Sequence, residues 1–167
     1  CQENEIEVTG TVFLKRAFEI KEIVKVCKDN EIEVTGSVFR RTATGIKEIV
    51  KVCKENGIEV TGSVFTKNSK QLKENIEYIK QNYGEEYLTN LIVSKNLKHL
   101  QKTLPYLQSI GVLETIKTSA SILSLTLEEI KERQAFIKNI GETIVIDGKF
   151  NRIFGMPKKR YQKKVKE

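Results

Sequence analysis

Apolar residues recur at helical spacing in the second half of a unit that the chain repeats. In one copy, Ile46 is followed three, four and seven positions later by Ile49, Val50 and Cys53. This spacing places side chains on one face of an α-helix. The equivalent residues in two other copies are Ile20, Ile23, Val24 and Cys27, and Leu72, Ile76 and Ile79. We therefore predict one long helix of about 13 residues in each copy.

Polar residues and glycines mark the ends of these helices. The residues before the five predicted helices are Arg16, Thr42, Asn68, Asn96 and Thr126, of which the last four are good N-cap types. Thr126 and Glu129 also have the spacing of a capping box. Gly57, Gly111 and Gly141 follow helices, and we expect each to form a left-handed C-terminal cap.

The first half of each copy is ambiguous. Residues 32–39 are rich in β-branched side chains and alternate in part, so propensity alone predicts a strand and an α/β horseshoe like that of leucine-rich repeats. Later copies spread their apolar residues at helical spacing, and Asn90 and Ala120 replace Gly36. We favour a short helix, a tight connection and then the long helix.

The copies follow one another with a period of 26 residues that lengthens along the chain. Repeats 1, 2 and 3 occupy residues 5–30, 31–56 and 57–82, and alignment places repeats 4 and 5 at about 85–110 and 115–141. Periods of this length are typical of solenoids. We predict a single all-α domain over residues 1–167, an α-solenoid of five helix-turn-helix repeats of 26 to 30 residues with a basic C-terminal cap at 142–167. Because residues 1–4 resemble the end of a repeat, we expect this domain to be the C-terminal part of a longer array.

The charge is unevenly distributed. The net charge is +7, and residues 142–167 hold eight Lys and Arg residues and three Asp and Glu residues, a local balance of +5. A basic tail on a nearly neutral array indicates an anionic partner. No apolar run approaches the roughly 18 residues of a membrane span, so we expect no membrane partner and a monomeric, cytoplasmic protein.

The cysteine and histidine residues do not indicate a metal-binding or catalytic site. Cys1, Cys27 and Cys53 are spaced by 26 residues, and Ile79, Leu107 and Ile137 take their place in later repeats, which indicates a small buried apolar position. His99 has no Cys or carboxylate at ligand spacing. We predict no metal, no cofactor and no catalytic site, and therefore no enzyme.

Three segments resemble a known family. Leu104–Leu113, Ser119–Thr126 and Ile137–Gly141 are similar to the repeat of mitochondrial transcription termination factors, here in a short form of 26 residues. The resemblance covers about 89–141 directly and the first three repeats through the internal alignment. It implies an all-α superhelix that binds nucleic acid along a basic groove. The family's usual proline before the Ile-Leu turn is replaced by Ser119 or Ala120.

Three short windows differ between nearly identical copies. They are Ala17–Glu19, Ala43–Gly45 and Ser69–Gln71, and each lies in the first turn of a predicted long helix. Backbone N–H groups and the helix dipole favour phosphate at such positions. We expect these variable windows to read elements of a ligand, although exposed loop residues also vary without a function.

A basic residue recurs beside each window. The members of this basic series are Lys15, Arg41, Lys67 and Lys95. In the tail, Tyr161 and Val165 have the spacing to dock on the last repeat while the lysines face outward.

The predicted function is that of a modular nucleic-acid-binding repeat protein, with DNA or RNA as the ligand. The predicted contact residues are Lys15, Arg16, Phe18, Arg40, Arg41, Thr44, Lys67, Asn68, Lys70, Gln71, Lys95, Lys98, Lys158, Lys159, Arg160, Lys163 and Lys164. The alternative is a scaffold for a protein partner that does not bind nucleic acid. The nearly neutral repeats favour this alternative, whereas the basic series and the tail favour nucleic acid.

Overall fold

The fold is all-α throughout the described residues. The computed structural model describes residues 15–118, 120–139, 156 and 158–165, and these ranges contain helices but no strand. The all-α prediction is confirmed, and the horseshoe alternative is wrong for these ranges. The chain divides into two compact units, an N-terminal unit at Cys1–Ser94 and a C-terminal unit at Lys95–Glu167, and each is described by itself.

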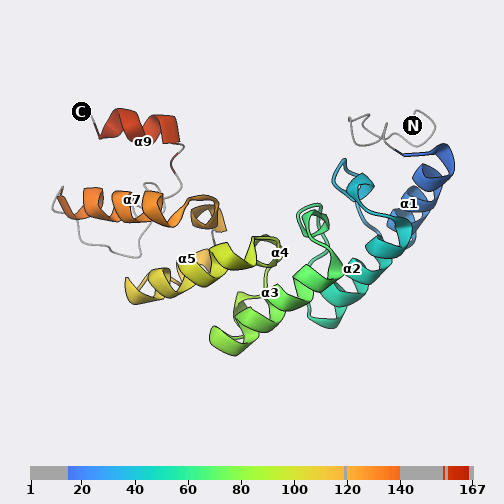
Figure 1. Cartoon of the computed structure of the whole chain (residues 1–167), viewed down its shortest axis with the longest axis horizontal. Helices are drawn as coiled ribbons and strands as arrows, with labels where there is room; N and C mark the ends of the chain where they lie inside the picture. Colours follow the sequence, from blue (N-terminus) through green and yellow to red (C-terminus); the bar gives the residue numbers. More distant parts are fainter. Residues whose placement is uncertain (1–14, 119, 140–155, 157, 166–167) are drawn as a thin grey trace. The chain divides into compact units, whose positions relative to one another are not determined.

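The five predicted long helices are present. They are α1 (Ala17–Asp29), α2 (Ala43–Glu55), α3 (Ser69–Asn82), α5 (Leu97–Ser109) and α7 (Leu127–Asn139), with 14 residues in α3 and 13 in each of the others. In the N-terminal unit, α1 packs on α2 and α2 packs on α3 (Figure 1). The helical spacing of apolar residues in the sequence was therefore sufficient to locate these helices.

The predicted N-caps are formed by side chains at the helix starts. The acceptors are Thr42 Oγ1 for the N–H of Gly45 at 3.1 Å, Asn68 Oδ1 for Gln71 at 2.8 Å, Asn96 Oδ1 for Lys98 at 2.9 Å and Thr126 Oγ1 for Glu129 at 3.2 Å. The Glu129 carboxylate accepts in return from the N–H of Thr126, which confirms the capping box. Arg16 has no acceptor on its side chain, and Glu19 instead accepts from its backbone N–H at 2.8 Å.

The first half of the repeat is described in repeats 2 to 5 and is helical there, although it is shorter than a full helix in repeats 2 and 3. The first half of repeat 1 lies outside the described residues. In repeats 2 and 3 the first half is a single 3₁₀ turn, η2 (Val38–Arg40) or η3 (Val64–Thr66). Hydroxyl pairs such as Thr35 with Ser37, 2.8 Å apart, offer local hydrogen bonds that compete with a helix. Repeats 4 and 5 use more turns, which are η4 (Glu85–Tyr87), α4 (Asn90–Val93), α6 (Thr115–Thr118) and η5 (Ala120–Ser124).

Residues with positive φ follow three of the long helices at the same aligned position. Gly57 has φ of 64° and Gly111 of 72°, which confirms two of the predicted caps, and Gly141 lies outside the described residues. Glu31 takes this position after α1 with φ of 57°, although it is not glycine. The next backbone N–H closes the cap in each example, as from Ile32 to the carbonyl of Cys27 at 2.9 Å. Glu31 was not predicted as a cap residue, because glycine is the residue usually found in this left-handed conformation.

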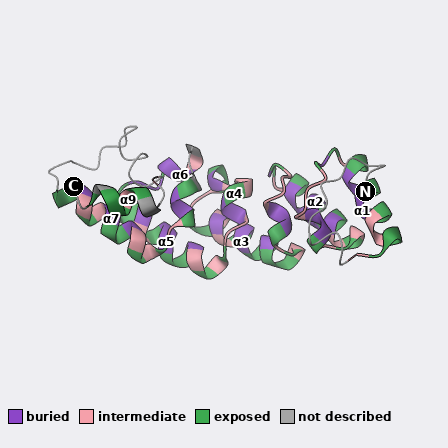
Figure 2. Ribbon diagram, turned by 90° about the horizontal axis from the view of Figure 1, so that it is seen from above, coloured by how far each residue is buried: buried purple, intermediate pink, exposed green. Residues whose placement is uncertain are grey.

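The core lies along the inward sides of the long helices. In the N-terminal unit, α2 and α3 carry buried residues on one side and exposed residues on the other (Figure 2). Cys27 and Cys53 are fully buried free thiols, and burial raises the pKa of each to about 11. The interpretation of the cysteine position as an apolar core position is confirmed for these two residues, and Ile79, Leu107 and Ile137 are buried at the same place.

Candidate functional site

The variable windows lie where the long helices begin. Phe18 has 58% of its surface exposed, and Thr44 and Lys70 are also exposed. Gln71 is occupied locally, because its side-chain oxygen accepts from the N–H of Asn68 at 3.2 Å while Asn68 caps Gln71. The capping box explains Asn68 and Gln71 without a ligand, whereas Phe18, Thr44 and Lys70 remain candidates for contact.

The basic series is half-buried rather than fully exposed. Arg41 Nε donates to the main-chain carbonyl of Phe65 at 2.9 Å, and so ties repeat 2 to the turn of repeat 3. Lys95 Nζ donates to Ser124 Oγ at 3.2 Å within the C-terminal unit, and burial lowers the pKa of Lys95. Two members of the series therefore also support the structure. Local sequence patterns carry no signal for these bonds, because the partners lie 24 and 29 residues away.

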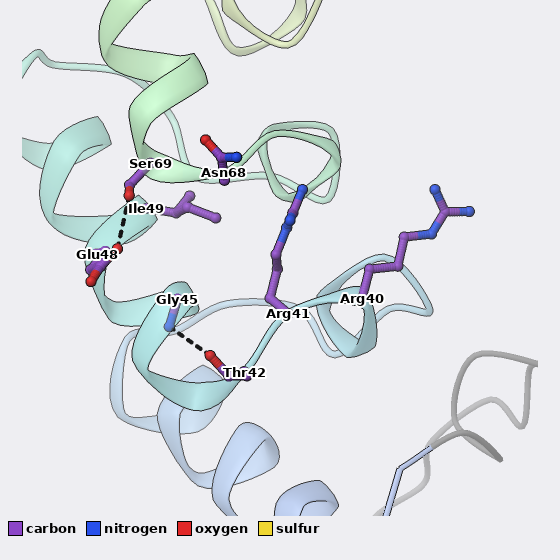
Figure 3. A pocket seen from close by; sticks show the side chains of 8 residues that line it. All are labelled: Arg40, Arg41, Thr42, Gly45, Glu48, Ile49, Asn68 and Ser69. Carbon is purple, nitrogen blue, oxygen red and sulfur yellow. Dashed lines mark hydrogen bonds between the residues drawn. The ribbon is translucent and has the colours of Figure 1, made fainter.

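A surface hollow of about 240 Å³ lies between the starts of α2 and α3 (Figure 3). Its lining residues are Arg40, Arg41, Thr42, Gly45, Glu48, Ile49, Asn68 and Ser69. The structure thus brings together three predicted contact residues, Arg40, Arg41 and Asn68. Figure 3 shows Arg41 reaching toward the turn of repeat 3, with Arg40 beside it on the outside.

The hollow combines features of opposite charge. Arg40 and Arg41 supply two cations, and the first turns of two helices contribute the positive ends of their dipoles. Glu48 opposes them, and its Oε2 accepts from Ser69 Oγ at 2.8 Å (Figure 3). Glu48 and Ser69 are not among the predicted contact residues, although Ser69 begins one of the variable windows. The balance still favours an anion, since one carboxylate faces two guanidinium groups.

The other predicted contact residues do not line this hollow. Lys15, Arg16 and Phe18 lie at the start of α1, Lys67 and Lys70 lie at the start of α3, and Lys95 and Lys98 lie at the start of α5. They occupy equivalent positions in successive repeats.

The basic tail forms a short helix, α9 (Lys158–Lys164). Tyr161 packs edge-on against Phe136 with ring centroids 5.8 Å apart, and the Arg133 guanidinium lies 4.8 Å from the centre of the Tyr161 ring. Docking of Tyr161 on α7 is therefore confirmed. Docking of Val165 is wrong, because that side chain is 48% exposed. Arg160 and Lys163 are exposed, and the side chains of Lys158, Lys159 and Lys164 lie outside the described set.

The described part of the chain holds no group of three or more His, Cys, Asp and Glu residues arranged to bind a metal ion. None of its helices is both long enough and apolar enough to cross a lipid bilayer. His99 makes a structural contact, since its Nε2 lies 3.1 Å from the carbonyl oxygen of Leu123.

The chain was compared with protein-family models, curated proteins and solved structures. None of the three comparisons found a match.

Proposed function

We propose that this chain is a nucleic-acid-binding α-solenoid, in which five helical repeats present helix starts and basic side chains to the phosphate backbone. The observation that carries the proposal is the hollow between α2 and α3. There Arg40 and Arg41 stand beside the first turns of two successive helices. The resemblance to mitochondrial transcription termination factors supports the same ligand class.

The physical argument rests on how phosphate is bound by proteins. A phosphodiester carries one negative charge and accepts hydrogen bonds from guanidinium groups and from backbone N–H groups at helix starts. Arg41 is held in place by its bond to Phe65, so little of its side-chain entropy remains to be lost on binding. The first turns of the long helices in successive repeats would then contact successive phosphates, as a modular binder requires.

The tail adds a second cationic surface to the proposal. Tyr161 holds α9 on α7, and Arg160 and Lys163 are exposed. We expect these side chains to add phosphate contacts that raise affinity without sequence preference.

The proposal is tested by measuring the affinity of the full chain for single- and double-stranded DNA and RNA across a salt series. Phosphate contacts release counterions, so the logarithm of the binding constant must fall steeply with the logarithm of salt concentration. Arg40→Ala should weaken binding to every sequence and reduce that slope by about one. Glu48→Gln should strengthen binding, because it removes the only acidic side chain among those that line the hollow.

Lys51→Ala is the matched control, because Lys51 is an exposed cation on α2 that does not line the hollow. It should change affinity much less than Arg40→Ala. Equal losses from the two variants would mean that only total charge matters. An absence of binding to all four nucleic acids at low salt would overturn the proposal itself.

The second candidate function is a scaffold for a protein partner. Phe18 and Leu91 favour it, because 58% and 50% of their surfaces are exposed. An exposed large apolar side chain can serve as an anchor for a protein partner. If a partner protein binds through Phe18, Phe18→Ser should abolish the complex, and added salt should have little effect on it.

A further inference from the structure

One backbone carbonyl recurs as a hydrogen-bond acceptor between repeats. Phe65, Val93 and Leu123 stand at the same aligned position, in the short helix of repeats 3, 4 and 5. We call their main-chain oxygens the turn carbonyls. All three residues are almost entirely buried, with 0%, 0% and 2% of their surfaces exposed. A buried carbonyl that lacks a partner costs about 1–3 kcal/mol, so each turn carbonyl needs a donor.

Each turn carbonyl receives its hydrogen bond from a side chain of the preceding repeat. Arg41 Nε donates to Phe65 at 2.9 Å, and Asn75 Nδ2 donates to Val93 at 2.7 Å, both within the N-terminal unit. Within the C-terminal unit, His99 Nε2 lies 3.1 Å from the oxygen of Leu123. A carbonyl only accepts, so the neutral imidazole must carry its proton on Nε2.

The three donors come from three different positions of the repeat. Arg41 precedes the N-cap of its long helix, His99 is the third residue of its helix and Asn75 is the seventh. Alignment places Lys67 opposite Arg41, and Gln71 opposite His99. The acceptor is thus constant at these three boundaries, whereas the donor differs at each of them.

Asn75 gives the strongest support for a specific role. Ile23 and Ile49 occupy its aligned position in repeats 1 and 2, and both are buried, so the repeat accepts an apolar residue there. Asn75 is also buried, with 2% of its surface exposed. A buried amide is costly unless it is hydrogen-bonded, and Asn75 meets this requirement through Val93.

We propose that each of these three boundaries requires one side-chain donor to its turn carbonyl, and that any position of the preceding repeat within reach of that carbonyl can supply the donor. The acceptor is a main-chain atom at the same aligned position in each following repeat, so donors from different positions are interchangeable. The proposal concerns assembly and does not depend on nucleic-acid binding.

The test transfers one donor from its own boundary to the next. In the full chain, Asn75→Ile installs the residue that repeats 1 and 2 carry and removes the donor to Val93. Amides of α4 should then exchange with deuterium about ten-fold or more faster, while those of α2 should not change. Adding Lys67→Arg recreates the Arg41 and Ile49 pair of the preceding boundary and should restore most of the lost protection.

Asn75→Ile with Lys73→Arg is the matched control, because Lys73 is an exposed lysine on the same helix. This control should show no rescue. Unchanged protection of α4 in Asn75→Ile would overturn the proposal, since the added apolar side chain would then replace the amide without loss. Equal protection in the Lys67→Arg and Lys73→Arg double variants would overturn it as well.

Discussion

Replacing Glu31 by glycine should stabilise the protein. Glu31 has φ of 57°, in the left-handed region, and Gly57 has φ of 64° at the aligned position. A residue with a Cβ atom costs about 1–2 kcal/mol there relative to a right-handed conformation. Glycine removes that cost but loses about 0.5–1 kcal/mol through the greater entropy of the unfolded chain. We therefore expect Glu31→Gly to raise the free energy of unfolding by about 0.5–1 kcal/mol.

The reciprocal change provides the internal comparison. A Cβ atom added at Gly57 would meet no heavy atom within 4 Å, so Gly57→Ala tests the backbone conformation without a steric clash. It should lower the free energy of unfolding by a similar amount, about 0.5–1 kcal/mol. Thermal unfolding followed by circular dichroism should show the melting temperature rising by about 1–4 °C in Glu31→Gly and falling in Gly57→Ala.

The two variants together decide whether the left-handed conformation is the cause. Both changes leave the surrounding helix caps intact, since the bonds from Ile32 to Cys27 and from Ile58 to Cys53 are made by the backbone at 2.9 Å. A melting temperature that falls in Glu31→Gly, or that stays constant in Gly57→Ala, would refute the reasoning.

Three further predictions follow from burial. Cys27 and Cys53 should resist alkylation at pH 8 until the chain is unfolded, because both thiols are buried with a pKa raised to about 11; rapid labelling of the folded protein would contradict this. Burial lowers the pKa of His99 more than the hydrogen bond to Leu123 raises it, and the charge of Lys95 lowers it further, so the folded state binds fewer protons than the unfolded state. The contribution of neutral His99 to stability should be present above the unfolded pKa of about 6.5 and be lost as pH falls through the lower folded pKa. The melting temperature should therefore fall less steeply between pH 7.5 and 5 in His99→Gln than in the unchanged protein, and equal slopes would contradict this. Tyr161→Ala should release α9 from α7, seen as faster proteolysis after the tail lysines, whereas Gln162→Ala, an exposed neighbour, should not.

The long helices and their caps were predictable because both depend on residues close together in the sequence. The spacing of Ile46, Ile49 and Cys53 places them on one face of a helix. Thr42 lies three residues before Gly45, whose backbone N–H donates to the Thr42 side chain. These patterns are local, so one copy of the repeat was enough to recognise them.

The short turns and the contacts between repeats were harder to predict. The β-branched residues before Val38 suit either a strand or a turn, and the packing of neighbouring repeats decides between them. The role of Arg41 depends on a carbonyl 24 residues away, and periodicity carries no information about that pair. The sequence therefore indicated a basic position beside each window but not the structural bond that this position makes.

The bond from Arg41 to Phe65 has a consequence for how such a chain can change its length. A tandem duplication of residues 31–56 would place a second Phe39 after Asn56, at the position that Phe65 now occupies. Phe39 lies in a 3₁₀ turn like that of Phe65, so the original Arg41 would find the same acceptor, and the Arg41 of the new copy would keep Phe65. Both of these main-chain oxygens would then have an arginine donor. The second repeat is in this sense a self-compatible module, and descent by duplication is open to it without compensating mutations.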